Sequence, residues 1–408
     1  MHKLLLIGLI LLLSTSCQPE QETLVNTDDV TLIKNGKWKF SFLTQKHEIP
    51  IRVTIKDDSL FIHNASEKIA LLIELKRDSF YISFPNFDSH LEGLIQSKDQ
   101  LKGIYVKDYV EDYSIPFIAF QNDDPVFEIT NNSFSIIKNK YATTFIDGED
   151  QSPAIGLFNQ YNSKVTGSFA TETGDYRFLE GVVDGGMLKL STFDGSHLYL
   201  FTAEIKGDSL VNGSFISGKG GNYKWSALYD DNAELRDPEK LTYLQNKDGD
   251  FDFDLVDLNN NPITLNDPSF EGKIKIIQIM GTWCPNCLDE SNYFNEVYPK
   301  YKSSGLEIIA VAFENGSDTL KVLEKLKKYK QNNNIEYTLL YGGKANSKTA
   351  EEVFPMLNKI MSFPTAIYLD RSNVVRKIYT GFYGPGTGNF YTEYTKSTEV
   401  FIEKLLAE

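Results

Sequence analysis

The sequence predicts a multi-domain chain in which an all-β barrel or sandwich precedes a C-terminal α/β domain. Two observations lead to this prediction. Between residues 31 and 229, short stretches of alternating apolar and polar residues follow one another without a helical segment. From residue 250 to residue 408, apolar runs alternate with segments of helical periodicity. The intervening residues 230–249 are polar and contain Pro238, as is typical of a linker.

Turn residues separate the expected strands of the first region. Asp57–Leu60 and Gly207–Leu210 each have the composition of a hairpin turn. The strands that the alternation indicates most clearly are Trp38–Phe42, Ile51–Ile55, Phe80–Phe84, Val165–Phe169, Leu188–Ser191 and Leu198–Phe201.

A similar motif occurs twice in this region, as FDSHL at residues 87–91 and as FDGSHL at residues 193–198. Two repeats, at about residues 31–125 and 135–229, explain the similarity. The alternative is a chance match between turn residues.

The second region alternates strands and helices and ends in a β-β-α unit, which is the order of the thioredoxin fold. The expected strands are Lys273–Met280, Leu306–Phe313, Tyr337–Tyr341, Thr365–Leu369 and Val374–Tyr379. The expected helices are Leu288–Lys302, Asp318–Gln331, Ser347–Ile360 and Thr392–Leu406.

Composition restricts the partners. With 41% hydrophobic residues in 408, the chain can bury two or three cores. A formal net charge of −15 without a long basic patch argues against nucleic acid as a partner.

We expect no cofactor and no metal, because no two histidines of the β region are paired at ligand spacing. Three cysteines are too few for disulfides to stabilise a chain of this size, so each cysteine requires a chemical explanation.

Residues 1–16 have the features of a secretory signal: one lysine, then an apolar run, Leu4–Leu13, too short to span a membrane. Small residues lead to Cys17, which resembles a lipoprotein signal, with Ser14 where the pattern usually has leucine. The resemblance implies that Cys17 is lipidated and that residues 17–30 form a tether to the membrane. A type I signal peptide with an incidental cysteine is the alternative.

The other two cysteines lie in the sequence WCPNC at 283–287, between the strand that ends at Met280 and a helix. A helix N-terminus favours negative charge, so Cys284 is expected to be a nucleophilic thiolate. Cys287, one turn further on, would resolve the mixed disulfide that Cys284 forms. A zinc half-site would need about four ligands, and a static disulfide closing so short a loop would stabilise little.

Residues Phe251–Leu406 resemble the TlpA/ResA-like thioredoxin family, whose members are anchored extracytoplasmic disulfide reductases. The residues that carry the resemblance are Thr282–Cys287, Glu290, Phe363–Thr365 and the entry Pro262–Leu265, in which Pro262 replaces the usual glycine.

The resemblance implies that Glu290 transfers a proton at the second cysteine, since Gln278 stands where other thioredoxins have an aspartate. It also implies a cis peptide bond at Pro364, opposite the cysteines. We expect Trp283 and Phe363 to contact the substrate with this proline. The alternatives are a surface glutamate and a trans proline that only begins a strand.

These features predict a lipoprotein of the cell envelope, facing the periplasm, that reduces disulfides of exported proteins. A membrane electron donor would reduce Cys284 and Cys287 again. Because Asn286 cannot carry a charge, a reducing or intermediate potential is favoured. Two alternatives stay open: a ligand-binding β barrel with an accessory redox domain, and a thiol peroxidase, for which the usual proline and threonine spacing before the cysteine is missing.

Overall fold

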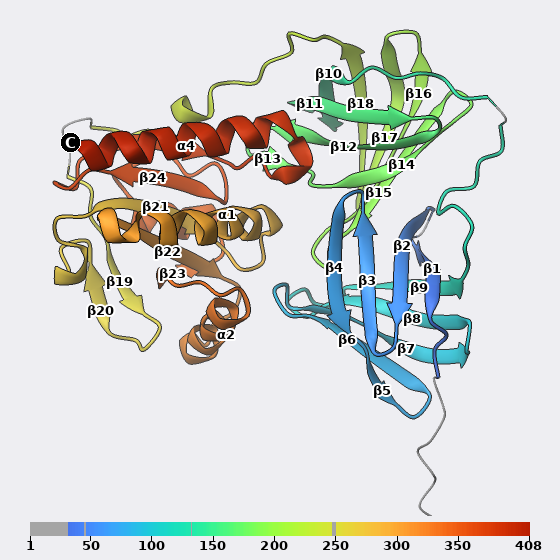
Figure 1. Ribbon diagram of the computed structural model, residues 1–408, viewed down its shortest axis with the longest axis horizontal. Coiled ribbons are helices and arrows are strands. Elements are labelled where there is room, and N and C mark those ends of the chain that lie inside the picture. The colour runs from blue at the N-terminus through green and yellow to red at the C-terminus, as the bar shows by residue number, and fades with distance from the viewer. Residues whose placement is uncertain (1–31, 45, 132, 247–249) are drawn as a thin grey trace, which may run out of the picture. The chain divides into compact units, whose positions relative to one another are not determined.

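The computed structural model describes residues 32–408, except for residues 45, 132 and 247–249, and Leu32–Glu408 form one compact unit. The expected signal and the tether with Cys17 lie outside the described residues. An all-β region is followed by an α/β domain (Figure 1), which confirms the predicted fold class. In the described part, no helix is long and apolar enough to cross a bilayer.

Nine antiparallel strands form the first sheet, in the order β4-β3-β2-β1-β9-β8-β7-β6-β5. Buried and exposed side chains alternate along these strands, as in β6, because successive residues of a strand point to opposite faces. The strands are β1 (Gly36–Leu43), β2 (Glu48–Lys56), β3 (Ser59–Asn64), β4 (Glu67–Leu72), β5 (Glu74–Lys76), β6 (Ser79–Phe84), β7 (Ser89–Ser97), β8 (Gln100–Lys107) and β9 (Ser114–Gln121).

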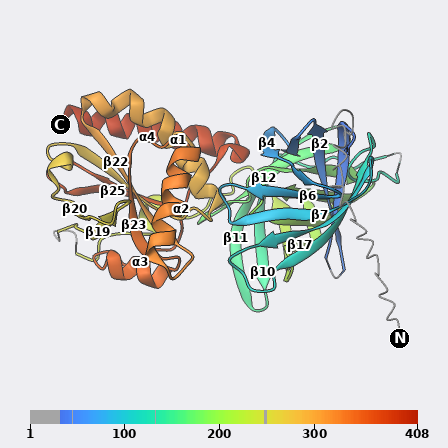
Figure 2. The same ribbon diagram turned by 90° about the horizontal axis from the view of Figure 1, so that it is seen from below.

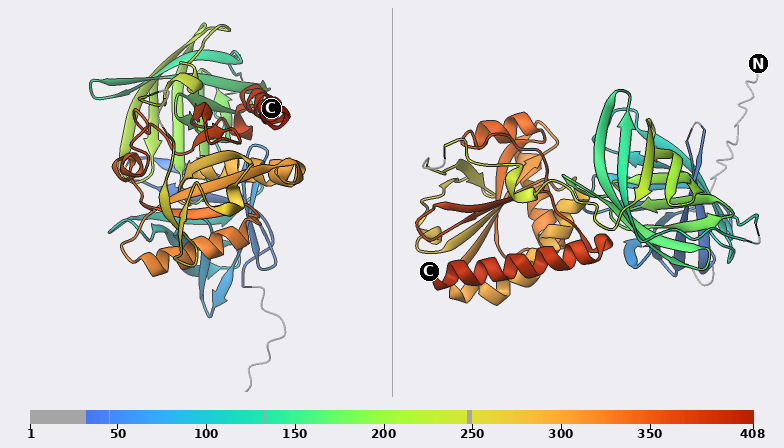
Figure 3. Two further views of the ribbon diagram at one scale, coloured as in Figure 1. Left: turned by 90° about the vertical axis from the view of Figure 1, so that its left-hand side faces the viewer. Right: turned by 90° about the horizontal axis from the view of Figure 1, so that it is seen from above.

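The second sheet also has nine strands, in the order β11-β10-β18-β17-β16-β15-β14-β12-β13, and it curves round on itself (green in Figure 3). Because β11 also pairs with β12, this sheet closes into a barrel, which removes its open edges. The strands are β10 (Lys140–Asp147), β11 (Asp150–Tyr161), β12 (Lys164–Thr171), β13 (Gly174–Asp175), β14 (Leu179–Asp184), β15 (Met187–Phe193), β16 (Leu198–Lys206), β17 (Ser209–Ser217) and β18 (Gly221–Tyr229).

The two sheets share a strand order. In each half, the first strand lies between the second and the last, so that β1 lies between β2 and β9 and β10 lies between β11 and β18. The two similar motifs, at 87–91 and 193–198, lie at the start of the seventh strand of their halves, β7 and β16. The two motifs therefore occupy corresponding positions in the two nine-stranded sheets.

The second motif joins the two β sheets. The Phe193 ring lies 4.7 Å from that of Phe42 and 4.9 Å from that of Tyr105, between ring centroids. The Tyr105 hydroxyl donates to the carbonyl of Gly195 at 2.8 Å. Gly195 has a φ of +92°, and a Cβ atom there would lie 2.1 Å from Phe84, so only glycine fits. The loop that follows Phe193 is therefore fixed against the first sheet.

The α/β domain has a seven-stranded sheet in the order β20-β19-β23-β22-β21-β24-β25, with helices on both faces (Figure 2). One face packs against α1, α2 and α4, and the other against α3 and the segment after it. The strands are β19 (Asp254–Asp257), β20 (Pro262–Thr264), β21 (Ile274–Met280), β22 (Leu306–Glu314), β23 (Thr338–Lys344), β24 (Thr365–Leu369) and β25 (Val375–Thr380). The helices are α1 (Pro285–Tyr301), α2 (Thr319–Asn332), α3 (Ser347–Val353) and α4 (Asn389–Ala407).

Three helix boundaries differ by three or more residues from those predicted, and one of them is the start of α4, at Asn389 rather than Thr392. The third helix ends at Val353 rather than Ile360, because Pro355 disfavours helical geometry at the residue before it. The first helix begins at Pro285 rather than Leu288, since a proline suits the first helical position, where no hydrogen-bond donor is needed.

The segment expected to be a linker contacts both neighbouring regions in its described part. Arg236 forms an ion pair with Glu172 of the barrel. Further on, the Thr242 backbone N–H donates to the Thr380 hydroxyl at 3.2 Å, and Thr242 is fully buried. Although its composition is polar, the segment therefore packs against both regions that it connects.

Candidate functional site

Cys284 is the N-cap residue of α1, at the end of the loop that follows β21. The backbone N–H of Cys287 donates to the sulfur of Cys284 at 3.2 Å. The two cysteines form a disulfide, in agreement with the pairing that we predict. The helix therefore directs its free N–H groups at the first of the two sulfur atoms.

The two cysteines differ in accessibility. Cys284 is 7% exposed, whereas Cys287 is fully buried. In the reduced protein, the helix N-terminus and the N–H group at Cys284 favour its thiolate over its thiol. This arrangement suits attack on a disulfide by the outer sulfur and resolution by the inner one.

The segment opposite the cysteines contains the expected proline. The Phe363–Pro364 bond is cis, as predicted, and the Phe363 carbonyl oxygen lies 3.3 Å from the sulfur of Cys284. The Trp283 indole donates to the Phe313 carbonyl at 2.9 Å, and its ring lies 5.6 Å from that of Phe363. Trp283, Phe363 and Pro364 thus surround the outer sulfur, where we expect substrate to bind.

A buried ion pair holds the loop before the cysteines. The carboxylate of Glu314 accepts from the Thr282 N–H at 2.6 Å and from its hydroxyl at 2.7 Å. Lys325 neutralises this carboxylate at 2.8 Å and also forms an ion pair with Asp88 of the first β sheet. The β region therefore helps to fix the backbone on the N-terminal side of Cys284.

Glu290 is fully buried in α1 rather than on the surface. Its carboxylate accepts from the Tyr394 hydroxyl at 2.8 Å and from the Gln278 amide at 2.9 Å. Burial raises the pKa of Glu290 to about 7, against the effect of these two hydrogen bonds. The same Gln278 amide lies 3.5 Å from the carbonyl oxygen of Cys287. Gln278 and Tyr394 thus position a carboxylate that can exchange a proton near neutral pH beside the inner cysteine.

Arg177, from the loop between β13 and β14, reaches the first turn of α1 and is buried there. Its guanidinium donates to the Pro285 carbonyl at 2.9 Å and forms an ion pair with Asp289 at 2.8 Å. It also forms ion pairs with Glu67 and Asp194, so this one cation links both β sheets to the helix that carries the cysteines.

The buried charges shift one another's protonation. Burial raises the pKa of Asp289 to about 7, although Arg177 opposes the shift. Burial also tends to raise the pKa of Asp194, but His197 and Arg177 hold that pKa below its usual range. The sequence did not identify Arg177, because its carboxylate partner Glu67 lies 110 residues away and no local pattern marks the pair.

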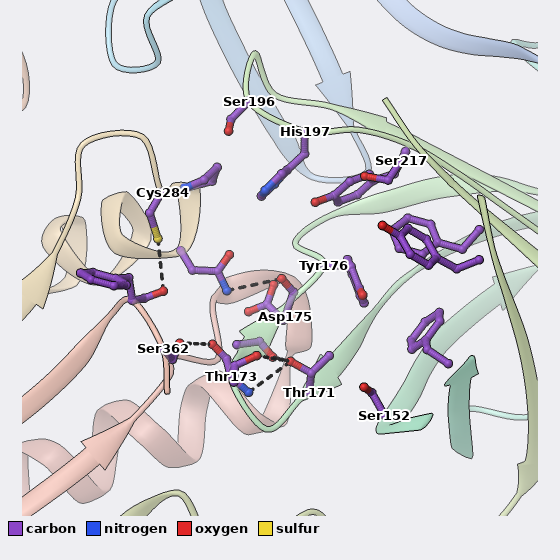
Figure 4. A pocket seen from close by; sticks show the side chains of 18 of the residues that line it. Ser152, Thr171, Thr173, Asp175, Tyr176, Ser196, His197, Ser217, Cys284 and Ser362 are labelled. Atoms are coloured by element: carbon purple, nitrogen blue, oxygen red, sulfur yellow. Dashed lines mark hydrogen bonds between the residues drawn. The ribbon is translucent and has the colours of Figure 1, made fainter. Parts of the chain in front are cut away.

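A cavity of about 770 Å³ lies beside Cys284, between the barrel and the α/β domain (Figure 4). On the barrel side its lining is largely aromatic, and near the sulfur it carries hydroxyl groups. His197 and Ser196 of the second motif also face it (Figure 4). The aromatic lining residues of the barrel are Phe145, Tyr176, Tyr199, Phe215 and Tyr223.

Two histidines, at equivalent places in the two motifs, lie beside carboxylates. His90 Nδ1 is 3.0 Å from Asp108, and His197 Nδ1 is 3.3 Å from Asp194. Among the residues that the structure describes, no group of three or more histidine, cysteine, aspartate or glutamate side chains is arranged to hold a metal ion.

Comparison with known proteins points to one family for the C-terminal domain. Residues 250–378 match the AhpC/TSA family. The thiol-disulfide oxidoreductase ResA of Geobacillus kaustophilus is 32% identical over 130 residues, which are 32% of this chain and 66% of that protein. ResA of Bacillus thuringiensis is 48% identical over 59 residues, 14% of this chain and 33% of that protein. A secreted thiol-disulfide isomerase structure from Corynebacterium glutamicum is 16% identical, with a TM-score of 0.32, and the likeness covers 43% of this chain and 99% of that one.

The chain thus spans less than two thirds of the length of the ResA proteins that it matches. The family match and the ResA relatives confirm the resemblance of the C-terminal domain that the sequence suggests. The β region lies outside the family match.

Proposed function

We propose that this protein is a membrane-anchored, extracytoplasmic thiol–disulfide oxidoreductase that reduces disulfides of exported proteins through Cys284 and Cys287. The observation that carries the proposal is the position of the Cys284 sulfur. It accepts from the Cys287 N–H at a helix N-terminus and lies opposite the cis proline, with Cys287 buried behind it. Asn286 is uncharged and so does not stabilise the thiolate further, which favours the reducing direction.

The reaction has two exchange steps. The Cys284 thiolate attacks one sulfur of the substrate disulfide, forms a mixed disulfide and releases the other sulfur as a thiol. Cys287 then loses its proton to Glu290 and attacks the sulfur of Cys284, which releases the second substrate thiol. The substrate gains two electrons and the Cys284–Cys287 pair is oxidised. A dithiol donor at the membrane must then reduce the pair.

Replacing Cys287 by serine tests this assignment. The variant keeps the attacking sulfur but lacks the resolving one, so we expect it to accumulate mixed disulfides with its substrates. Non-reducing electrophoresis of the full-length variant, followed by release with a reductant, measures them. A variant that forms no more mixed disulfide than the Cys284→Ser protein would contradict the proposed order of the two cysteines.

Replacing Glu290 by glutamine tests the proton acceptor. Resolution of the mixed disulfide should slow by about 10²-fold near pH 7, because the amide cannot accept the proton of Cys287. Since the pKa of Glu290 is raised to about 7, the wild-type rate should rise with pH through about 7, and the variant should lack this step. Rapid-quench measurements of mixed-disulfide decay between about pH 6 and pH 9 report both.

The matched control for this variant is Glu296→Gln, since Glu296 is an exposed carboxylate of the same helix. It should resolve mixed disulfides at the wild-type rate. Equal rates for the Glu290→Gln protein and the wild type at every pH would show that Glu290 does not accept the proton.

The lipid anchor has a separate test. Replacing Cys17 by alanine removes the acylation site and should move the protein from the membrane fraction to the soluble fraction. Fractionation of cells that express either form, with immunodetection, measures the distribution. Tight membrane association of the Cys17→Ala protein would rule out anchoring through this residue.

A further inference from the structure

The closed barrel of the second sheet covers the active cysteine. The Ser362 hydroxyl donates to the Thr173 carbonyl at 2.6 Å, and the Ser196 hydroxyl donates to the Trp283 carbonyl at 3.3 Å. The Asn286 amide donates to the Asp175 carbonyl at 3.4 Å. Two barrel loops, at 171–177 and 193–198, therefore hold the backbone on both sides of Cys284, which leaves this sulfur facing the cavity rather than an open surface.

The cavity limits the size of what can reach the sulfur. A volume of about 770 Å³ is within the range of sites that bury a small ligand or a few residues of a peptide. We expect the two barrel loops to hinder the approach of a disulfide set in the broad surface of a folded protein, because they contact the backbone on both sides of Cys284. A flexible chain end or a short peptide would enter.

The barrel side of the cavity has the chemistry of a side-chain pocket. The Tyr176 ring lies 5.6 Å from that of Tyr199 and 5.1 Å from that of Phe215, between centroids, and Tyr223 lies 5.4 Å from Phe215. Tyr176 and Tyr223 are half-buried, so their rings still offer free surface. Such an arrangement favours another aromatic ring, through edge-to-face contacts and burial of apolar area.

The opposite side is polar. The hydroxyls of Thr173, Ser196 and Ser362 and the amide of Asn286 line the cavity near the sulfur. Ser362, Ser196 and Asn286 each donate to a backbone carbonyl of the protein, and their oxygen atoms can still accept hydrogen bonds from the backbone of a peptide. The aromatic side of the cavity, its polar side and the sulfur of Cys284 together suit a substrate peptide in which a cysteine stands beside an aromatic residue.

From this juxtaposition we propose that the cavity between the barrel and Cys284 is the substrate site, and that it selects short, flexible peptide disulfides whose cysteine is flanked by an aromatic residue. This inference rests on the proposed function and adds its substrate class. The Cys284 thiolate attacks the peptide's disulfide as described above, while the flanking ring occupies the pocket formed by Tyr176, Tyr199 and Tyr223.

The test compares substrates on the pre-reduced, full-length protein. Short synthetic peptides with one cysteine, disulfide-linked to glutathione, carry either phenylalanine or alanine beside it. The second-order rate constant should be about 10-fold higher for the phenylalanine peptide. A folded protein with a surface disulfide should react more slowly than either peptide. Equal rates for the two peptides, or fastest reduction of the folded protein, would overturn the inference.

Variants of the barrel sharpen the test. Tyr176→Ala and Tyr223→Ala should each reduce the preference for the phenylalanine peptide to about 3-fold or less. Tyr161→Ala is the matched control, because Tyr161 belongs to the same barrel but is 79% exposed and lies outside the cavity. It should keep the full preference. A preference that persists in both cavity variants would overturn the assignment to the barrel. If wild-type Cys284 reacts with none of these disulfides, it is the proposed function that fails.

Discussion

Replacing Cys284 by serine will lower the rate of disulfide reduction by at least about 10³-fold, since a hydroxyl cannot replace a thiolate as the attacking group. The fold should be retained, because the serine oxygen can accept from the Cys287 N–H as the sulfur does. The measurement is the release of thiol from a small disulfide by the full-length reduced protein, with thermal unfolding as the check on folding.

The same role predicts which thiol reacts first with an alkylating reagent. Cys284 is 7% exposed and caps the helix, whereas Cys287 is fully buried, so the reduced wild type should be modified first at Cys284. Peptide mapping after brief alkylation identifies the site. Faster modification of Cys287 would reverse the roles that we assign.

Replacing Arg177 by methionine will lower the free energy of unfolding by about 3–5 kcal/mol at neutral pH. The substitution keeps much of the side-chain volume but leaves Glu67, Asp194 and Asp289 buried near one another without their shared cation. Urea unfolding of the two proteins measures the difference. The loss should be largest above about pH 7, where Asp289 is charged.

The pH dependence follows from the direction of the shifts. The pKa of Asp289 is raised to about 7 in the folded protein, so the folded state binds this proton more tightly than the unfolded state. The contribution of Asp289 to stability therefore falls as pH rises from about 4 to about 7. Without Arg177 the carboxylate is still harder to ionise, so the deficit of the variant should shrink at acid pH.

Arg236→Met is the matched control for this experiment. Arg236 also forms an ion pair, with Glu172, but its side chain is 62% exposed, and water replaces much of the interaction when it is lost. This variant should unfold close to the wild type. Similar losses for the two arginine variants would show that the Arg177 cluster has no special role in holding the barrel to the active-site helix.

The α/β domain could be predicted in outline because its signals are local. The apolar run of β21 and the WCPNC sequence after it predict the strand–loop–helix unit of the site. The cis proline Pro364 was predictable from its neighbours Phe363 and Thr365. The predicted end of α3 is wrong. The helical pattern of the sequence continues past Val353, but Pro355 ends the helix there.

The rest of the site depends on contacts between distant parts of the chain. The sequence identified Glu290, but its partner Tyr394 lies 104 residues further on. The strands of the β region were predictable from alternation, whereas the pairing of β10 with β18, the first and last strands of the barrel, on which its closure also depends, was not. The cavity beside Cys284 results from that closure and from the docking of the barrel, which no local pattern reports.

The two similar motifs make different contacts with the α/β domain. In the FDSHL motif, Asp88 forms an ion pair with Lys325 and so braces the α/β domain. In the FDGSHL motif, Ser196 contacts the backbone of Trp283 and its neighbouring histidine lines the cavity. The one residue by which the motifs differ in length is Gly195, the position that tolerates no side chain. A single additional glycine therefore distinguishes the motif that contacts α2 from the motif that lies beside Cys284 and lines its cavity.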